Sequence, residues 1–272
     1  MTGRGQSHLD HAADAQEPGS PAPGQKVALV TGGTRGIGLA ISQRLAAARY
    51  HVIVSSRSGE AVDQAVAACR ADGGQATGMT CDVGNRDSLN QLMNAVAGQY
   101  GRLDVLVNNA GMLPRATRAE RVTEAEWDRA LGINLSGPWF LARRAHALMN
   151  EAGGVIINIT STAAHYPSTG LAPYNVSKAG LTMLTRVLAL EWARDGIRVL
   201  AVAPGKIDTD LLAPIKALVA ENRAVLNPQK RIGQPGDVAA LVSFLISEAA
   251  AYITGVVVPV DGGELLVASS TG

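Results

Sequence analysis

The strongest signal for the fold of this chain is the stretch Val27-Ala28-Leu29-Val30-Thr31-Gly32-Gly33-Thr34-Arg35-Gly36-Ile37-Gly38. Its start is apolar and β-branched, which is typical of a buried strand. The glycines that follow allow a tight turn, and helical spacing begins at Ile37. A helix that starts at such a turn points free N–H groups and the positive end of its dipole at the turn. The stretch therefore predicts a phosphate-binding turn, the alternative being a structural turn without a ligand.

Short strands and longer helices alternate along the rest of the chain. The predicted strands are Val27–Thr31, His51–Ser55, Ala76–Thr80, Val105–Asn108, Val155–Ile159, Arg198–Ala203 and Val256–Val260. The predicted helices are Ile37–Ala48, Glu60–Ala71, Arg86–Tyr100, Thr123–Met149 with a break, Ser177–Arg194 and Asp237–Ser247. Most of these strands are almost continuously apolar, as strands are when helices cover both faces of a sheet. We therefore predict one α/β domain with a Rossmann-type, doubly wound parallel sheet of about seven strands.

Composition excludes several classes of protein. The chain has 272 residues, is 47% hydrophobic and carries a formal net charge of +1, so we expect no binding to nucleic acid or to a membrane surface. No apolar run is long enough to span a bilayer. Cys69 and Cys81 form neither a disulfide framework nor a metal-ligand spacing, so we expect no metal and a cytoplasmic location. Met1–Gly24 is polar and rich in Pro, Gly and Ala, and we expect a disordered tail there, followed by a catalytic domain over 25–272.

The glycine spacing and later motifs together point to one family. The turn reads Gly32-x-x-x-Gly36-x-Gly38 rather than G-x-G-x-x-G, and it resembles the turn of the classical short-chain dehydrogenase/reductase family. Asn108-Asn109-Ala110-Gly111 after the fourth strand, Pro204-Gly205 after the sixth and Val260-Asp261-Gly262-Gly263 near the end match further motifs of that family. The resemblance covers about 26–266, and it implies an oxidoreductase with a nicotinamide dinucleotide cofactor.

The end of the second strand indicates which dinucleotide is bound. NAD sites usually place an acidic side chain there, which binds the adenosine ribose. Here the strand is followed by Ser56 and Arg57, and no acid occurs before Glu60. Arg35 lies within the glycine turn, and two guanidinium groups suit a ribose 2′-phosphate. We therefore predict NADP(H), the alternatives being NAD(H) and two solvated arginines.

The resemblance also implies where the cofactor is bound. In the family, the position of Asp82 contacts the adenine, and those of Ile207 and Thr209 contact the nicotinamide carboxamide. The full set of predicted cofactor-binding residues is Gly32, Thr34, Arg35, Gly36, Ile37, Gly38, Ser56, Arg57, Asp82, Val83, Asn109, Ala110, Gly111, Tyr174, Lys178, Pro204, Gly205, Ile207 and Thr209.

Four residues are the candidate catalytic group. Tyr174 and Lys178 are four residues apart, which places them on one face of a helix. An ammonium beside a phenol favours the phenolate, so we expect Lys178 to lower the pKa of Tyr174 and make it a general acid/base. Ser161, after the fifth strand, can orient a substrate oxygen. Asn134 lies where a long helix breaks and resembles the family's fourth catalytic residue, the alternative being a simple kink.

The substrate is not identified by the sequence. By resemblance, 206–235 form the substrate cover. Its basic residues (Lys206, Lys216, Arg223, Lys230, Arg231) and a second run (Arg115, Arg118, Arg121) suit either an anionic substrate or solvated loops, and we favour the latter. His165 and Tyr166 either line the substrate pocket or form a surface turn.

The helix over Ser177–Arg194 is apolar around much of its circumference, so we expect it to be buried on more than one side. Because the family packs this helix between subunits, we expect a homotetramer, with a dimer as the second choice.

The favoured activity is reduction of a ketone or a 3-oxoacyl group by NADPH, with Tyr174 as acid/base. An NAD-dependent polyol or sugar-acid dehydrogenase is the alternative. A non-catalytic dinucleotide sensor typically lacks the Tyr or the Lys, and related epimerases and dehydratases carry another glycine spacing, so both are disfavoured.

Overall fold

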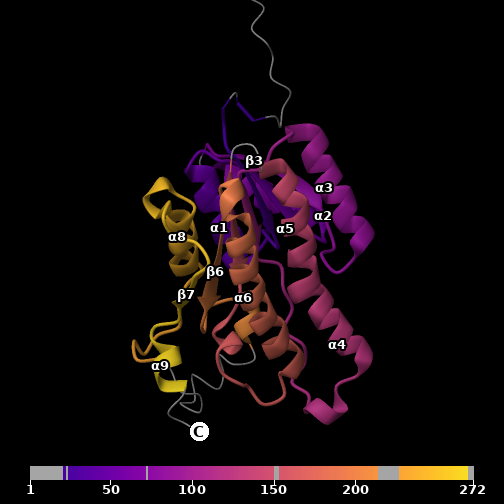
Figure 1. Cartoon of the computed structure of the whole chain (residues 1–272), viewed down its shortest axis with the longest axis vertical. Coiled ribbons are helices and arrows are strands. Elements are labelled where there is room, and N and C mark those ends of the chain that lie inside the picture. The colour runs from indigo at the N-terminus through magenta and orange to yellow at the C-terminus, as the bar shows by residue number, and fades with distance from the viewer. Residues whose placement is uncertain (1–20, 23, 72, 150–152, 214–226, 269–272) are drawn as a thin grey trace, which may run out of the picture.

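The computed structural model describes residues 21–22, 24–71, 73–149, 153–213 and 227–268 (Figure 1). Nearly all of the expected N-terminal tail lies outside these described residues, and so does the middle of the expected substrate cover, 214–226. Within them, no helix has both the length and the apolar character that crossing a membrane requires.

One parallel sheet forms the centre of the molecule. Its strands are β1 (Val27–Thr31), β2 (His51–Ser56), β3 (Gln75–Thr80), β4 (Val105–Asn108), β5 (Gly154–Ile159), β6 (Ile197–Pro204) and β7 (Val257–Val260). They lie in the order β3-β2-β1-β4-β5-β6-β7, and every neighbouring pair is parallel. This confirms the predicted doubly wound fold. The strand order reverses between β1 and β4, which is where such sheets bind ligands.

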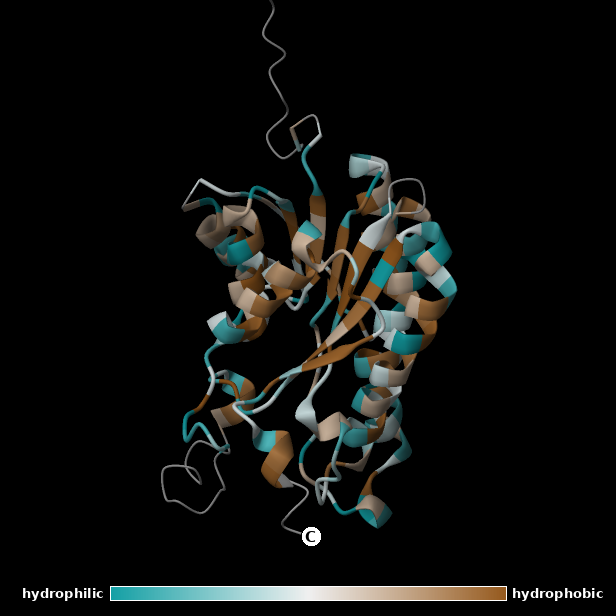
Figure 2. Ribbon diagram, turned by 60° about the vertical axis from the view of Figure 1, so that its left-hand side comes forward, coloured by the Kyte–Doolittle hydropathy of each residue, from teal (hydrophilic) through white to brown (hydrophobic). Residues whose placement is uncertain are grey.

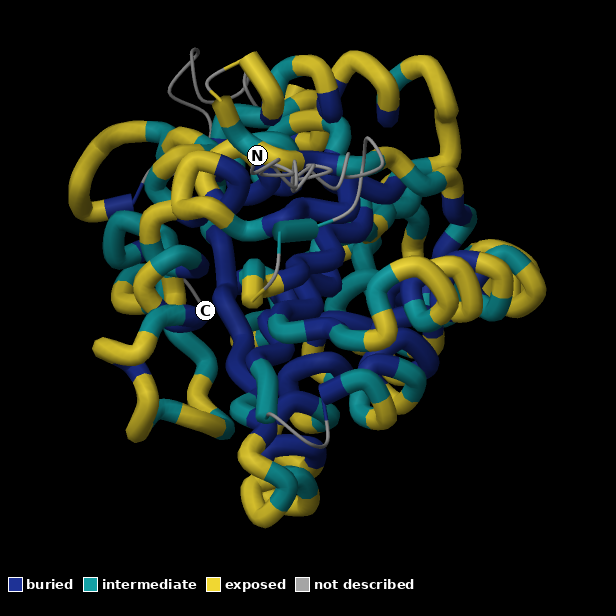
Figure 3. Tube along the Cα trace, turned by 90° about the horizontal axis from the view of Figure 1, so that it is seen from above, coloured by how far each residue is buried: buried dark blue, intermediate teal, exposed yellow. Residues whose placement is uncertain are grey.

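Helices connect the strands and cover both faces. They are α1 (Gly36–Ala47), α2 (Gly59–Ala71), α3 (Arg86–Tyr100), α4 (Glu124–Leu131), α5 (Gly137–Met149), α6 (Ala172–Trp192), α8 (Pro235–Leu245) and α9 (Glu264–Ala268). Figure 2 shows the apolar strands between two layers of helices, and Figure 3 shows that buried backbone is concentrated in the middle of the molecule. α4 and α9 lie at the lower end of the view in Figure 1, the end toward which the strands run.

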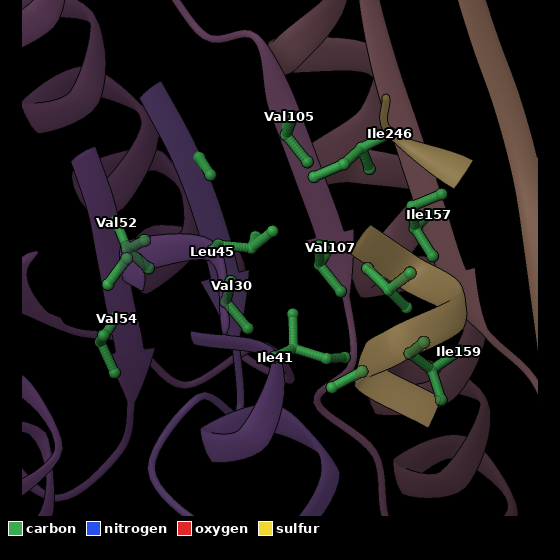
Figure 4. Close-up of a cluster of buried hydrophobic side chains, with 14 of the residues drawn as sticks. Val30, Ile41, Leu45, Val52, Val54, Val105, Val107, Ile157, Ile159 and Ile246 are labelled. Carbon is green, nitrogen blue, oxygen red and sulfur yellow. The ribbon is translucent and has the colours of Figure 1, made fainter. Parts of the chain in front are cut away.

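Alternating strand residues supply the two halves of the core. In β1, Ala28 and Val30 pack in a cluster with side chains of α1, α2 and α8, part of which Figure 4 shows. Val27 and Leu29 point to the other face and pack with α3, α5 and α6. Burial on both faces explains why these strands are continuously apolar. Both cysteines are buried and reduced, as expected of small core residues.

Three helical segments differ from the sequence prediction. α6 begins at Ala172, five residues before the predicted start at Ser177, because Pro173 fits the first turn of a helix, where no backbone N–H donor is needed. The predicted break in the long helix is a π-helical turn, Gly132–Ser136, between α4 and α5. α9 was not predicted, because five residues are too short to show a helical period.

Candidate active site

A cavity of about 700 Å³ opens at the carboxyl ends of the strands. It is lined by all of the predicted cofactor-binding residues, among them Ser56, Arg57, Asp82, Val83, Pro204 and Gly205. Of the four candidate catalytic residues, Ser161, Tyr174 and Lys178 line it, whereas Asn134 lies behind its wall and is completely buried. Segments that are far apart in the sequence therefore meet in one cavity, as the strand topology predicted.

The glycine turn is packed too tightly to accept larger residues. Gly32 and Gly36 have positive φ angles of 61° and 51°, which glycine adopts without strain. A Cβ on Gly38 would overlap the Gly32 carbonyl oxygen and lie 2.5 Å from Asn109 Nδ2. The side chain of Arg35, the residue before α1, makes no capping hydrogen bond, and Gly36, Ile37 and Gly38 of the first turn of α1 line the cavity. The turn is therefore shaped as a cradle for an anion.

The motif after β4 fastens this turn to the sheet. Asn109 Nδ2 donates to the carbonyl oxygens of Thr31 and Gly32, each at 3.0 Å. The Thr31 hydroxyl accepts from the backbone N–H of Asn109 and of Ala110, both at 3.1 Å. Asn108 instead points into the core, where its Nδ2 donates to Asn158 Oδ1. Asn109 thus supports the turn, and Asn108 joins β4 to β5.

Two arginines lie at the mouth of the cavity. Both Arg35 and Arg57 line it and are exposed. Arg35 Nη1 lies 2.9 Å from Asp210 Oδ2, with both side chains about three quarters exposed at 74% and 77%. An exposed pair of this kind is worth little and can exchange its partner for another anion. Asp82 also lines the cavity, and its Oδ1 accepts a hydrogen bond from the backbone N–H of Gly84 at 2.9 Å.

The side of the cavity that contains the candidate catalytic residues is formed by α6 and the end of β5. Tyr174 and Lys178 lie in the first turns of α6, and the Lys178 ammonium donates to the Ile159 carbonyl oxygen at 2.8 Å. Its nitrogen lies 5.9 Å from the centre of the Tyr174 ring. Ser161 follows β5, and its hydroxyl accepts from the Ala163 backbone N–H while also bonding the Tyr174 phenol. The three side chains are therefore in one place, with a phenol and a hydroxyl together.

The expectation that Lys178 lowers the pKa of Tyr174 is wrong. Burial raises the pKa of the Tyr174 phenol, and its hydrogen bond with Ser161 acts in the opposite direction but more weakly. Burial also lowers the pKa of the Lys178 ammonium to about 8. Lys178 makes its hydrogen bond to Ile159 rather than to the phenol, so desolvation dominates. The Tyr174 phenol therefore carries its proton at neutral pH.

Asn134 joins the π-helical turn to this side of the cavity. Its Nδ2 donates to the Met112 carbonyl oxygen at 3.0 Å and to Ser177 Oγ at 3.1 Å. Its Oδ1 accepts the Met112 backbone N–H at 2.9 Å. Ser177 in turn donates to the Tyr174 carbonyl oxygen. A π-helical turn is a common feature of functional sites, and here it brings Asn134 against the helix that carries Tyr174.

A buried carboxylate at this side of the cavity was not singled out from the sequence. Glu264 is only 6% exposed and accepts from Tyr166 and Lys206. All three line the cavity, whereas His165 is exposed and does not. The Val260-Asp261-Gly262-Gly263 turn at the carboxyl end of β7 was a signal that the next residue would reach this edge. Arg115, Arg118 and Arg121 are exposed outside the cavity, which favours the interpretation as solvated charges.

Comparison with a family model extends over most of the chain. The model described as Enoyl-(Acyl carrier protein) reductase matches residues 32–264, from the glycine turn to the buried carboxylate. Together with the fold and the motifs above, this match decides the family. The chain belongs to the classical short-chain dehydrogenase/reductase family.

Known proteins similar to this short-chain dehydrogenase/reductase match it over most of its length. Dehydrogenase/reductase SDR family member 4 of Oryctolagus cuniculus is 42% identical over 241 residues, 88% of this chain and 93% of the relative. The 3-oxoacyl-[acyl-carrier-protein] reductase of Synechocystis sp. is 41% identical over 244 residues, 89% and 97% of the two chains. A crystal structure of a variant actinorhodin polyketide ketoreductase with NADPH superposes with a TM-score of 0.83 at 34% identity, covering 90% of this chain and 98% of the other. The chain is an oxidoreductase of the carbonyl/alcohol type.

Substitution of Gly38 tests the cradle. We expect Gly38→Ala to weaken dinucleotide binding and to lower the free energy of unfolding by about 1–3 kcal/mol, because the new Cβ overlaps the Gly32 carbonyl oxygen. Gly98→Ala in α3 is the matched control, since no atom lies within 4 Å of the Cβ it would add. Calorimetric titration and thermal unfolding measure both effects, and equal behaviour of the two variants would contradict the close packing.

The buried ammonium of Lys178 predicts a pH dependence of stability. Its pKa is lowered to about 8 in the folded protein, against an ordinary 10.5, so the unfolded chain binds more protons between these values. Unfolding free energy should therefore rise with pH from about 8 to about 10.5 by up to about 3 kcal/mol relative to Lys178→Met. Denaturant titrations of the cofactor-free wild type and variant at pH 7, 8.5 and 10 measure this difference. A constant difference across these pH values would refute it.

Proposed function

We propose that this protein is an NADP(H)-dependent reductase of ketone or 3-oxoacyl groups, with Tyr174 as the general acid. The observation that carries the proposal is the meeting of Tyr174, Ser161 and Lys178 in the cavity that also contains the glycine turn. A phenol with its proton and a neighbouring hydroxyl suit a carbonyl oxygen that gains negative charge and then a proton. Relatives named as 3-oxoacyl and polyketide ketoreductases support the same chemistry.

The residues present fit a dinucleotide with a 2′-phosphate. Gly32, Gly36 and Gly38 form the cradle that larger side chains would fill, and they would hold the pyrophosphate. Arg35, Ser56 and Arg57 would bind the 2′-phosphate through guanidinium and hydroxyl donors. Asp82 would accept from the adenine amine, and Ile207 and Thr209 would meet the nicotinamide carboxamide. NADP(H) supplies the hydride when it is bound.

Each catalytic side chain has a distinct role in this proposal. Ser161 donates a hydrogen bond to the substrate carbonyl oxygen and orients it beside the Tyr174 hydroxyl. Tyr174 donates its proton to that oxygen as charge develops on it. Because burial raises the phenol pKa, the proton is present at neutral pH, which favours the direction of reduction. Lys178, whose pKa is near 8, is suited to return a proton to Tyr174 after each turnover.

Asn134 completes the group without lining the cavity. Its amide holds both the segment at Met112 and the side chain of Ser177, three residues after Tyr174. A Cβ on Gly111 would lie 3.3 Å from Asn134 Oδ1 and 3.5 Å from Lys178 Nζ, so both polar groups face the same narrow space. We assign Asn134 the role of holding α6 and the path by which protons reach Lys178.

One apolar face of α6 supports a proposal for the assembly. Val176, Met183, Val187 and Leu190 are exposed there in the single chain, so a neighbouring subunit would have to supply the second buried side expected of this helix. An exposed apolar row on a long helix is typical of a subunit interface. We propose that a second subunit covers it and that the protein is a homotetramer, with a dimer as the alternative. The buried, reduced cysteines favour a cytoplasmic location.

Replacement of Tyr174 tests the mechanism. We expect Tyr174→Phe to lower kcat for ketone reduction by about 100- to 10,000-fold, because the general acid is lost, while NADPH affinity stays within about twofold. Tyr252→Phe, at a fully exposed tyrosine, is the control and should behave as wild type. Stopped-flow absorbance of NADPH and fluorescence titration measure the two quantities. Wild-type turnover in Tyr174→Phe would overturn the assignment.

The two arginines test the cofactor. Wild type should bind NADPH more tightly than NADH, and Arg35→Ala together with Arg57→Ala should weaken NADPH binding by at least about tenfold while NADH affinity changes little. Asp210→Asn should strengthen NADPH binding slightly, because Arg35 loses a competing partner. Arg118→Ala, at an exposed arginine outside the cavity, is the matched control. Equal affinity of wild type for NADPH and NADH would contradict the NADP(H) assignment.

A further inference from the structure

A buried ion pair lines the cavity beside the catalytic group. Lys206 Nζ lies 2.5 Å from Glu264 Oε1, and only 19% and 8% of their side chains are exposed. Lys206 directly follows Pro204-Gly205 at the end of β6, and Glu264 is the first residue of α9. The pair therefore links two segments that are 58 positions apart in the chain. None of the proposed catalytic or cofactor roles uses either charge.

Tyr166 makes the third member of this cluster. Its hydroxyl donates to the same carboxylate oxygen, Glu264 Oε1, at 2.8 Å. Burial raises the pKa of Tyr166 to about 12, so the phenol remains a donor at any ordinary pH. The backbone carbonyl oxygen of Tyr166 accepts from Asn175 Nδ2 at 3.0 Å, next to Tyr174. The cluster is thereby fixed to the helix that carries the proposed acid.

The hydrogen bonds within the cluster are unevenly distributed. Two donors share Glu264 Oε1, while Oε2 is buried and has no hydrogen-bond partner among the described residues. The Lys206 ammonium has three N–H donors, and among the described residues one of them donates to Glu264. An incompletely satisfied buried carboxylate costs stability and calls for an explanation. Here its charge holds the ammonium in place on the cavity wall.

We infer that Lys206, held by Glu264, determines substrate specificity by binding a second oxygen atom of the substrate, apart from the carbonyl that is reduced. This deepens the proposed carbonyl reduction and rests on it. The paired carboxylate offsets the charge of Lys206 and repels an anion. The favoured substrate therefore carries a neutral second oxygen, a ketone or a hydroxyl, rather than a carboxylate.

Matched pairs of ketones test this inference. Cyclohexane-1,4-dione and cyclohexanone share a skeleton and differ in the second oxygen, and decalin-1,5-dione and 1-decalone repeat the comparison over a longer span. With NADPH as the reductant, kcat/KM of wild type should be at least about tenfold higher for the diketone than for the matching monoketone in at least one of the two pairs. The difference should come chiefly from a lower KM for the diketone. Lys206 touches the second oxygen and not the reacting one, so kcat should differ little within that pair.

The variants separate recognition from folding. Lys206→Met alone would leave the buried carboxylate of Glu264 without its cation. The main variant therefore combines Lys206→Met with Glu264→Gln, so that neither side chain is charged. In this double variant, the ratio of kcat/KM for the diketone to that for the monoketone should fall about tenfold. Its kcat/KM for the monoketone, its NADPH affinity and its thermal unfolding temperature should stay near those of wild type. Lys26→Met is the matched control, since it removes an exposed Lys–Glu pair outside the cavity.

Each outcome decides the inference. Loss of the diketone preference in the double variant, with monoketone reduction intact, supports it. Three results would overturn it: wild type shows no preference for the diketone, the double variant keeps the preference, or kcat/KM falls equally for both ketones. Each of these results would leave the proposed reductase function standing. Absence of NADPH oxidation with every ketone would overturn the proposed function itself, and this inference with it.

Discussion

The close approach of the glycine turn to the end of β4 is the constraint on which the rest of the site depends. Gly38 packs on the Gly32 carbonyl oxygen, and the Asn109 amide binds the carbonyl oxygens of Thr31 and Gly32 from the neighbouring strand. These contacts exist because β1 and β4 lie side by side in a sheet whose order reverses between them. They fix the start of α1, and thus the direction of its N–H groups, before any ligand arrives.

The same sheet brings the candidate catalytic groups to the other side of the cavity. β5 ends just before Ser161, and its last residue, Ile159, receives the ammonium of Lys178 from α6. The buried lysine is thus anchored by a backbone carbonyl, and the tyrosine one turn earlier is placed beside Ser161. Burial of the Lys178 ammonium costs folding stability, whereas burial of Tyr174 raises the pKa of its phenol and thereby favours the protonated form.

Much of this could be predicted from the sequence, because the signals are local. Most of the seven strands have almost continuous apolar runs, and the motifs follow the strands, so the topology brings Gly32, Asn109, Ser161 and Tyr174 together. What failed depends on tertiary environment. The pKa of Tyr174 follows its burial rather than its spacing from Lys178, and the Lys206–Glu264 pair joins residues with no common local pattern. The early start of α6 came from the position of Pro173 in its first turn.

In the proposed reaction, a protein acid protonates the carbonyl oxygen while the carbon is reduced. Isotope effects on ketone reduction in single turnovers test it most directly, with NADPH deuterated at the transferred position, in H2O and in D2O. Deuterated NADPH and D2O should each slow the same step, because in this mechanism Tyr174 would donate its proton as the carbonyl is reduced. A slower step with deuterated NADPH and no effect of D2O would contradict it.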